Sequence, residues 1–177
     1  GMNRLEAAHA MGHQHAATLF NLNVLSPMAL VEAIYPSMRE HGQGSIVNVS
    51  SVAAINTPTG LAHYSATKAA LAKYSEALHL EAKADGIHVL TVYPGPVTTA
   101  MEASVRKGYS SDLGLAGGLP MGTPEELATK VAKAIRAKTR KVYYPEFYRS
   151  AFAFPVLSQC LTEKFSPQPR SELPAAH

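Results

Sequence analysis

Apolar residues recur at helical spacing in the first quarter of the chain. Between Ala16 and Glu40 they stand four, three, four and three residues apart, which places them on one face of a helix. Gly42 and Gly44 follow and end the pattern. We therefore predict a long amphipathic helix over Ala16–Glu40. Its apolar face comprises Val24, Met28, Val31, Tyr35 and Met38.

Three short runs further along are mostly apolar, as in strands buried on both faces. They cover Ser45–Val49, Ile87–Tyr93 and Lys141–Tyr144. Helical segments separate them, one alanine-rich from about Ala62 to Asp85 and one from Thr123 to about Lys138 that opens with a capping box. This alternation predicts an α/β fold: a partial doubly wound (Rossmann-like) parallel sheet with helices on both faces.

The length of 177 residues fits a single domain over residues 1–177, and we expect the Pro-rich end, about 166–177, to be a disordered tail. No apolar stretch approaches the about 18–20 residues of a membrane span, so we expect no membrane partner. Cys160 is the single cysteine, which excludes an internal disulfide and suits a reducing, cytoplasmic location.

Neither the charge pattern nor the histidines indicate a binding site for a polyanion or a metal ion. The net charge is only +3, and the basic run from Lys130 to Lys141 is typical of a solvated helix face, so we expect no nucleic-acid partner. One candidate metal cluster consists of three histidines, His9, His13 and His15. They lack a carboxylate set nearby, and we expect no metal site.

Tyr64 and Lys68 can act together in acid–base chemistry. They lie four residues apart and share a helix face. A lysine ammonium beside a phenol stabilises phenolate and lowers the pKa of the phenol, and such a tyrosine can give a proton to a developing alkoxide or take one from an alcohol. An exposed pair on a solvated face would have the same spacing. However, Ser51 and Pro94 each follow a predicted strand, where an open parallel sheet presents its ligand site.

Over about residues 16–145 the chain resembles the short-chain dehydrogenase/reductase family. Three stretches carry the resemblance: Asn48-Val-Ser-Ser51, Tyr64-Ser-Ala-Thr-Lys68 and Pro94-Gly-x-Val-x-Thr99. The resemblance implies an NAD- or NADP-dependent oxidoreductase that interconverts a small-molecule carbonyl and a secondary alcohol. The substrate, and the choice between NAD and NADP, stay open.

The resemblance also implies a role for each matching residue. Tyr64 is the general acid/base, Lys68 lowers its pKa and binds the nicotinamide ribose, and Ser51 bonds the substrate oxygen. The cofactor-binding set comprises Tyr64, Lys68, Pro94, Gly95, Val97 and Thr99, the last two at the carboxamide. The Gly-rich segment Gly108–Gly122 matches a mobile loop that usually covers substrate.

Asn23 matches the fourth polar residue of the family. Pro27 has no N–H, so the Asn23 carbonyl loses its helical partner and can bind an ordered water. That water would suit a proton relay from Lys68 to solvent, the task that the resemblance implies. The alternative is a proline-bent helix in which Asn23 is incidental.

The chain lacks the glycine-rich turn that begins the dinucleotide site of this family. It therefore resembles a C-terminal portion, and strand Ser45–Val49 has an open edge. A misassigned gene start, a degenerate gene and a half supplied by a partner would each account for this. An alternative function is a catalytically inactive fragment that acts as a binding or assembly module.

Two segments concern association and the substrate pocket. The helices Ala16–Glu40 and Ala62–Asp85 match the pair at the subunit interface of most family members, so we expect a homodimer or higher homo-oligomer, with a monomer as the alternative. The C-terminal aromatic segment is expected to pack against the body, with a substrate or partner surface as the alternative. It includes Phe147, Tyr148, Phe152, Phe154, Val156 and Leu157.

Overall fold

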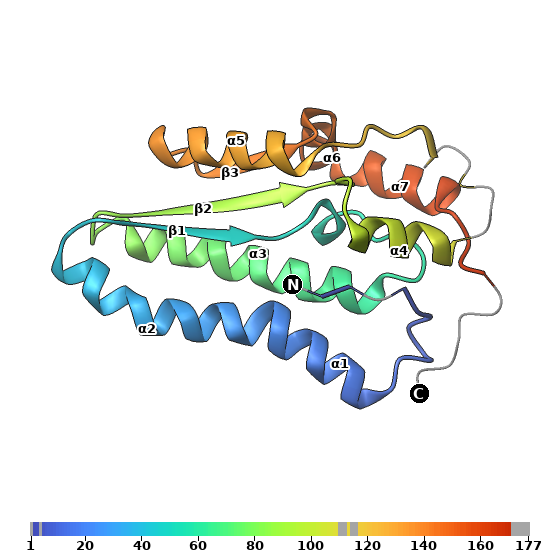
Figure 1. Ribbon diagram of the computed structural model, residues 1–177, viewed down its shortest axis with the longest axis horizontal. Helices are drawn as coiled ribbons and strands as arrows, with labels where there is room; N and C mark the ends of the chain where they lie inside the picture. Colours follow the sequence, from blue (N-terminus) through green and yellow to red (C-terminus); the bar gives the residue numbers. More distant parts are fainter. Residues whose placement is uncertain (1, 4, 110–112, 114–116, 171–177) are drawn as a thin grey trace.

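Three short parallel strands form the centre of the molecule, and their order is β1-β2-β3 (Figure 1). The computed structural model describes residues 2–3, 5–109, 113 and 117–170. The strands are β1 (Gly44–Val49), β2 (Ile87–Pro94) and β3 (Lys141–Tyr144). In the register, β1 pairs with β2 over its whole length, and β3 pairs with the second half of β2.

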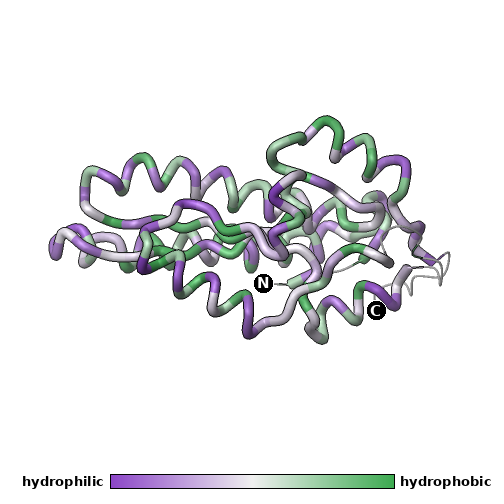
Figure 2. Tube along the Cα trace, turned by 90° about the horizontal axis from the view of Figure 1, so that it is seen from above, coloured by the Kyte–Doolittle hydropathy of each residue, from purple (hydrophilic) through white to green (hydrophobic). Residues whose placement is uncertain are grey.

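Helices cover both faces of this sheet (Figure 1). α2 (Ser26–Glu40) and α3 (Ala62–Ala82) lie on one face, and α5 (Pro124–Arg136) lies on the other. Side chains of β2 alternate between the two layers. One layer contains Val31, Ile46, Leu78, Ala82 and Val89, and the other contains Leu90, Val92, Ala134 and Val142. Figure 2 shows the central strands as mostly hydrophobic and the helices as mixed. The predicted fold class is confirmed.

Among the described strands, β1 pairs only with β2 and forms one edge of the sheet. Val49 at its end is 48% exposed. The open edge expected for this strand is therefore present within the part of the chain that the structure describes.

The first helix is continuous but changes its winding near Pro27. α1 (His13–Phe20) leads into a π-helical turn, η1 (Asn21–Leu25), and then into α2. The Ser26 N–H donates to the Asn21 carbonyl, a five-residue bond that accommodates the missing N–H of the proline. The irregularity that Pro27 predicted is present, and the predicted apolar face is buried at Val24 and Val31.

The expectation about membrane-spanning length needs a correction. The combined helix His13–Glu40 has 28 residues and is long and apolar enough to cross a membrane, by length and composition. The apolar residues are spread between polar ones, so no single run revealed this. In this fold α1 and η1 lie against α3, and 22% of the apolar window of the helix is buried.

Four short helices follow the strand ends. They are η2 (Val52–Ala54), α4 (Ala100–Gly108), η4 (Glu146–Tyr148) and α6 (Arg149–Ala153), and α7 (Pro155–Phe165) then closes the described chain. Of the tail expected to be disordered, the Ser166 hydroxyl accepts from the Thr59 N–H and the Arg170 N–H donates to the Gly108 carbonyl. Residues 171–177 lie outside the described part, as do 110–112 and 114–116 of the expected Gly108–Gly122 loop.

The C-terminal aromatic segment packs only in part. Tyr148 is buried, and Phe152 packs edge-on against Tyr93 and at a tilt against Tyr143, with ring centroids 4.5 Å apart in each pair. In contrast, Phe147, Phe154, Val156 and Leu157 are exposed. The expectation that the segment packs against the body is wrong for these four. Phe147, Phe154 and Leu157 line a cavity, and Val156 is 78% exposed and does not line it.

Candidate active site

Two consecutive serines connect the end of β1 to the rest of the site. The Ser50 N–H donates to the Val92 carbonyl at 2.8 Å, and its hydroxyl donates to the Lys68 carbonyl at 2.8 Å. These bonds fix the strand end against β2 and α3. The Ser51 hydroxyl caps η2 by accepting from the Ala53 N–H and also donates to the Pro94 carbonyl, at 3.3 Å. Ser51 is therefore held in place at the carboxyl end of the sheet.

Tyr64 and Lys68 share one face of α3, as their spacing predicted. The Lys68 ammonium lies 5.7 Å from the centre of the Tyr64 ring and donates to the Val49 carbonyl at 2.9 Å. Lys68 is only 7% exposed. Burial disfavours the charged form and lowers the pKa of Lys68 from 10.5 to about 8.

The pKa of Tyr64 shifts in the opposite direction from the one that the lysine spacing predicted. Burial of the phenol raises its pKa above 10, a hydrogen bond with Ser51 lowers it in part, and the Glu102 carboxylate raises it further. The Lys68 ammonium, 5.7 Å from the centre of the ring and bonded to the Val49 carbonyl, does not reverse this rise. Tyr64 therefore keeps its proton at neutral pH.

Asn23 contacts the site through a neighbour of Tyr64. Its side-chain amide exchanges two hydrogen bonds with the Met2 backbone, each 2.8 Å, and donates to the Thr67 hydroxyl at 3.1 Å. Thr67 in turn donates to the Tyr64 carbonyl at 2.7 Å. Asn23 is 2% exposed. Its side chain thus positions the start of α3. Pro27, four residues after Asn23, has no N–H to donate to the Asn23 carbonyl.

The segment after β2 is shaped by close backbone contacts. The Gly95 N–H donates to the Tyr144 carbonyl, and a side chain at Gly95 would come within 2.6 Å of the Tyr148 ring. Val97 forms a bridge with Gly122, made by the Pro96 carbonyl and the Thr98 N–H rather than by the peptide groups of Val97 itself.

Thr99 ends this segment by capping α4, accepting from the Glu102 N–H at 3.2 Å. Among the described residues, the bridge to Gly122 does not use the Val97 peptide groups, which can therefore bond to a planar amide such as the nicotinamide carboxamide. Lys68 and Tyr64 stand at the same cavity with donors suited to ribose hydroxyls. The residues present therefore fit the nicotinamide end of a dinucleotide.

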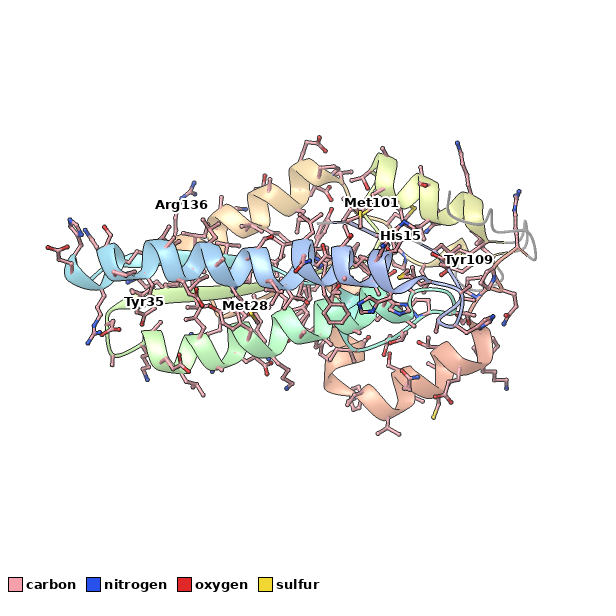
Figure 3. The ribbon with its side chains drawn as sticks, turned by 90° about the horizontal axis from the view of Figure 1, so that it is seen from below. His15, Met28, Tyr35, Met101, Tyr109 and Arg136 are labelled. Carbon is pink, nitrogen blue, oxygen red and sulfur yellow. The ribbon has the colours of Figure 1, made fainter. Side chains whose placement is uncertain are left out.

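One cavity of about 980 Å³ joins these parts. Ser51, Tyr64 and Lys68 line it together with Pro94, Gly95, Val97 and Thr99. Of the predicted site residues, Asn23 alone does not line it. The far walls are α4 and α7, which lie at the same end of the molecule (Figure 1). Met101 and Tyr109 mark the two ends of the α4 wall in Figure 3.

Sequence reasoning missed three contributors to this site. α4 was not predicted, although Thr99 and Glu102 form the same Ser/Thr-x-x-Glu capping pattern that was used to predict α5. Thr67 gave no signal, because its two hydrogen-bond partners come together only in the fold. The α7 wall was interpreted as packed core, since an apolar run does not say what covers it.

A parallel α/β sheet that carries a serine and a tyrosine–lysine pair at one end defines a class of nucleotide-dependent oxidoreductases. The sequence profile described as short chain dehydrogenase matches residues 1–110, and the chain belongs to this family. Ketoacyl reductase HetN from Nostoc sp. is 36% identical over 126 residues, covering 71% of this chain and 42% of that protein.

Solved structures agree in fold. A short chain dehydrogenase from Burkholderia cenocepacia in complex with NADP has a TM-score of 0.77 at 23% identity, over 93% of this chain and 67% of that one. The bulky-bulky ketone specific alcohol dehydrogenase from Comamonas testosteroni has a TM-score of 0.70 at 25% identity. The match covers 98% of this chain and 63% of that one. The chain spans about half the length of the curated relatives it matches.

Proposed function

We propose that this protein is an NAD(P)-dependent oxidoreductase that interconverts a carbonyl compound and a secondary alcohol. The observation that carries the proposal is the single cavity lined by Ser51, Tyr64 and Lys68 beside the Pro94–Thr99 segment. Family membership supports it, as do relatives named for reducing a ketoacyl group or a ketone. Cys160 is free and exposed, which suits a cytoplasmic enzyme.

In this mechanism the Ser51 hydroxyl holds the carbonyl oxygen and Tyr64 gives its proton to that oxygen as negative charge develops. Tyr64 suits the acid role because its raised pKa keeps it protonated at neutral pH. We therefore expect Tyr64 to donate its proton in reduction near neutral pH, and to act as the base for alcohol oxidation in a more alkaline solution.

A nicotinamide dinucleotide supplies the hydride when bound. We assign Lys68 and Tyr64 to its ribose, and Val97 and Thr99 to its carboxamide. With a pKa of about 8, Lys68 is still mostly charged at neutral pH, and its ammonium has two further N–H groups beyond the bond to Val49. Asn23 keeps the water-holding role as a proposal, with its side chain anchored through Thr67.

The proposal is tested by the rate at which the 177-residue chain consumes NADPH or NADH in the presence of a ketone. Tyr64→Phe removes only the hydroxyl, and we expect it to lower turnover by about 100-fold or more. Tyr74→Phe on the same helix, whose side chain does not line the cavity, is the matched control and should retain activity.

Two results would go against the proposal. Equal activity of Tyr64→Phe and the wild type would refute the assigned mechanism. Absence of dinucleotide binding in calorimetry at millimolar NADP(H) and NAD(H) would instead favour an inactive binding or assembly module, for which the open edge of β1 is the supporting observation.

We also propose a homodimer. The outer surface of α1, η1 and α2 exposes several large apolar side chains that a second copy would cover. They are Phe20, Leu22, Leu25 and Leu30.

A further inference from the structure

The cavity has a wall of apolar side chains that nothing else in the described chain covers. α7 contributes Phe154, Leu157 and Leu161, which are 65%, 60% and 50% exposed and yet line the cavity. Isolated exposed apolar residues are ordinary, but a contiguous group that lines a concave site indicates a ligand surface. The α7 wall is therefore built to contact something apolar.

α4 provides the facing wall. Met101, Val105 and Tyr109 line the cavity from this helix, and Val105 and Tyr109 pack with Leu61 in a small apolar cluster that holds α4 in place. Figures 1 and 3 both show α4 and α7 at the end of the molecule where the strands end. An apolar ligand between these helices has one end at Ser51 and Tyr64.

The two charged residues of α4 that line the cavity pair with each other. Apart from tyrosines, the ionisable residues among the described part of the lining are Lys68, Glu102 and Arg106. Arg106 and Glu102 form an ion pair at 2.9 Å. Lys68 lies at the catalytic end of the cavity, where it donates to the Val49 carbonyl. The nearby amide of Asn56 and hydroxyl of Ser158 bond to each other. Among the residues that the structure describes, the lining between α4 and α7 thus offers no unpaired cation to a carboxylate or phosphate.

We infer that the substrate is a large, uncharged ketone, or the corresponding secondary alcohol, with apolar groups that lie between α4 and α7. This inference rests on the proposed function. A volume of about 980 Å³ is at the upper end of the range for small-molecule sites, so it holds a bulky substrate beside the nicotinamide. Burying a carboxylate among these side chains has a large desolvation cost, which disfavours charged keto acids.

Calorimetric titration with benzophenone and with benzoylbenzoate tests the inference, because the second probe is the same diaryl ketone with a carboxylate. We expect benzophenone to bind about tenfold or more tightly than benzoylbenzoate. Leu157→Asp should weaken benzophenone binding by about tenfold or more, since it replaces an apolar contact by a charge. Leu161→Asp is a second variant with the same expected result.

Val156→Asp is the matched control, because Val156 is the neighbour of Leu157 on α7, is 78% exposed and does not line the cavity. It should bind benzophenone as the wild type does. Equal affinity for the two ketones, or equal binding by Leu157→Asp and Val156→Asp, would overturn the inference. So would light scattering in which Leu157→Asp alone lowers an oligomer's mass, because the wall would then be an interface between copies.

Binding and turnover separate this inference from the proposed function. Leu157-dependent binding of benzophenone without any reduction would refute the proposed function and leave the preference of the cavity standing. Reduction of a short charged keto acid such as pyruvate, without binding of benzophenone, would overturn the inference and leave the proposed function intact.

Discussion

Replacing Lys68 by methionine should stabilise the protein at neutral pH and destabilise it at alkaline pH. Lys68 is 7% exposed, and within the described residues its ammonium donates one hydrogen bond, to the Val49 carbonyl. Methionine has a similar length and no charge to desolvate. The substitution thus removes both the cost of burying the charge and the benefit of that bond.

The magnitude follows from the pKa of Lys68, which burial lowers from 10.5 to about 8. The folded protein then binds this proton more weakly than the unfolded chain does, which costs about 3 kcal/mol at pH 7. The bond to Val49 offsets about 1 kcal/mol. Lys68→Met should therefore raise the free energy of unfolding by about 2 kcal/mol at pH 7.

The effect of Lys68→Met on the free energy of unfolding changes sign at high pH. Between about pH 8 and 10.5 the unfolded chain binds more protons at Lys68 than the folded protein, so wild-type stability gains with rising pH. Above 10.5 both states are neutral and the cost of burial is gone. Only the missing bond to Val49 is left, and the variant should then be less stable by about 1 kcal/mol.

Urea unfolding followed by circular dichroism, at pH 7 and at pH 10.5, measures both differences. Other titrating groups are common to the two proteins and cancel. Lys73→Met is the control, because the Lys73 side chain is 82% exposed on the same helix and should show little dependence on pH. A Lys68→Met effect that does not change with pH would refute the reasoning, as would a loss of stability at pH 7.

Three further predictions concern the fold, assembly and pH. Gly122→Ala should lower the free energy of unfolding by about 2 kcal/mol in urea titration, because its methyl group would overlap the Tyr144 ring, whereas Gly118→Ala meets nothing and should be neutral. Light scattering should give at least twice the 18.9 kDa chain mass, and Leu25→Asp should reduce it to one chain. Alcohol oxidation should increase as the pH rises toward 10, since Tyr64 must lose its proton to act as a base; a rate independent of pH would contradict this role.

The layers of the fold could be predicted because each strand and helix has its own local pattern of apolar residues in the sequence. The strands are short, mostly apolar runs, which is typical of strands that are buried on both faces. The change of helical winding before Pro27 was predictable for a similar reason, since a missing N–H removes the hydrogen-bond donor of the carbonyl four residues earlier. The positions of Tyr64 and Lys68 follow from helical spacing alone.

The rest of the site depends on contacts between distant segments. The Asn23 amide is held by Met2 and Thr67, which are 21 and 44 residues away in the chain. The direction of the Tyr64 pKa shift depends on burial, and the Ser51 hydroxyl and the Glu102 carboxylate also act on it; none of these is visible in the spacing. The apolar run of α7 is the same in sequence whether it covers a core or lines a cavity.

Transfer of deuterium from the cofactor to the product tests the central claim most directly. The chain is incubated with benzophenone and with NADPH or NADH that carries deuterium at the transferable position of the nicotinamide, and the alcohol is analysed by mass spectrometry. We predict one deuterium on the carbinol carbon with the wild type and no detectable labelled alcohol with Tyr64→Phe. No labelled alcohol from the wild type, or the same yield from Tyr64→Phe, would contradict the account.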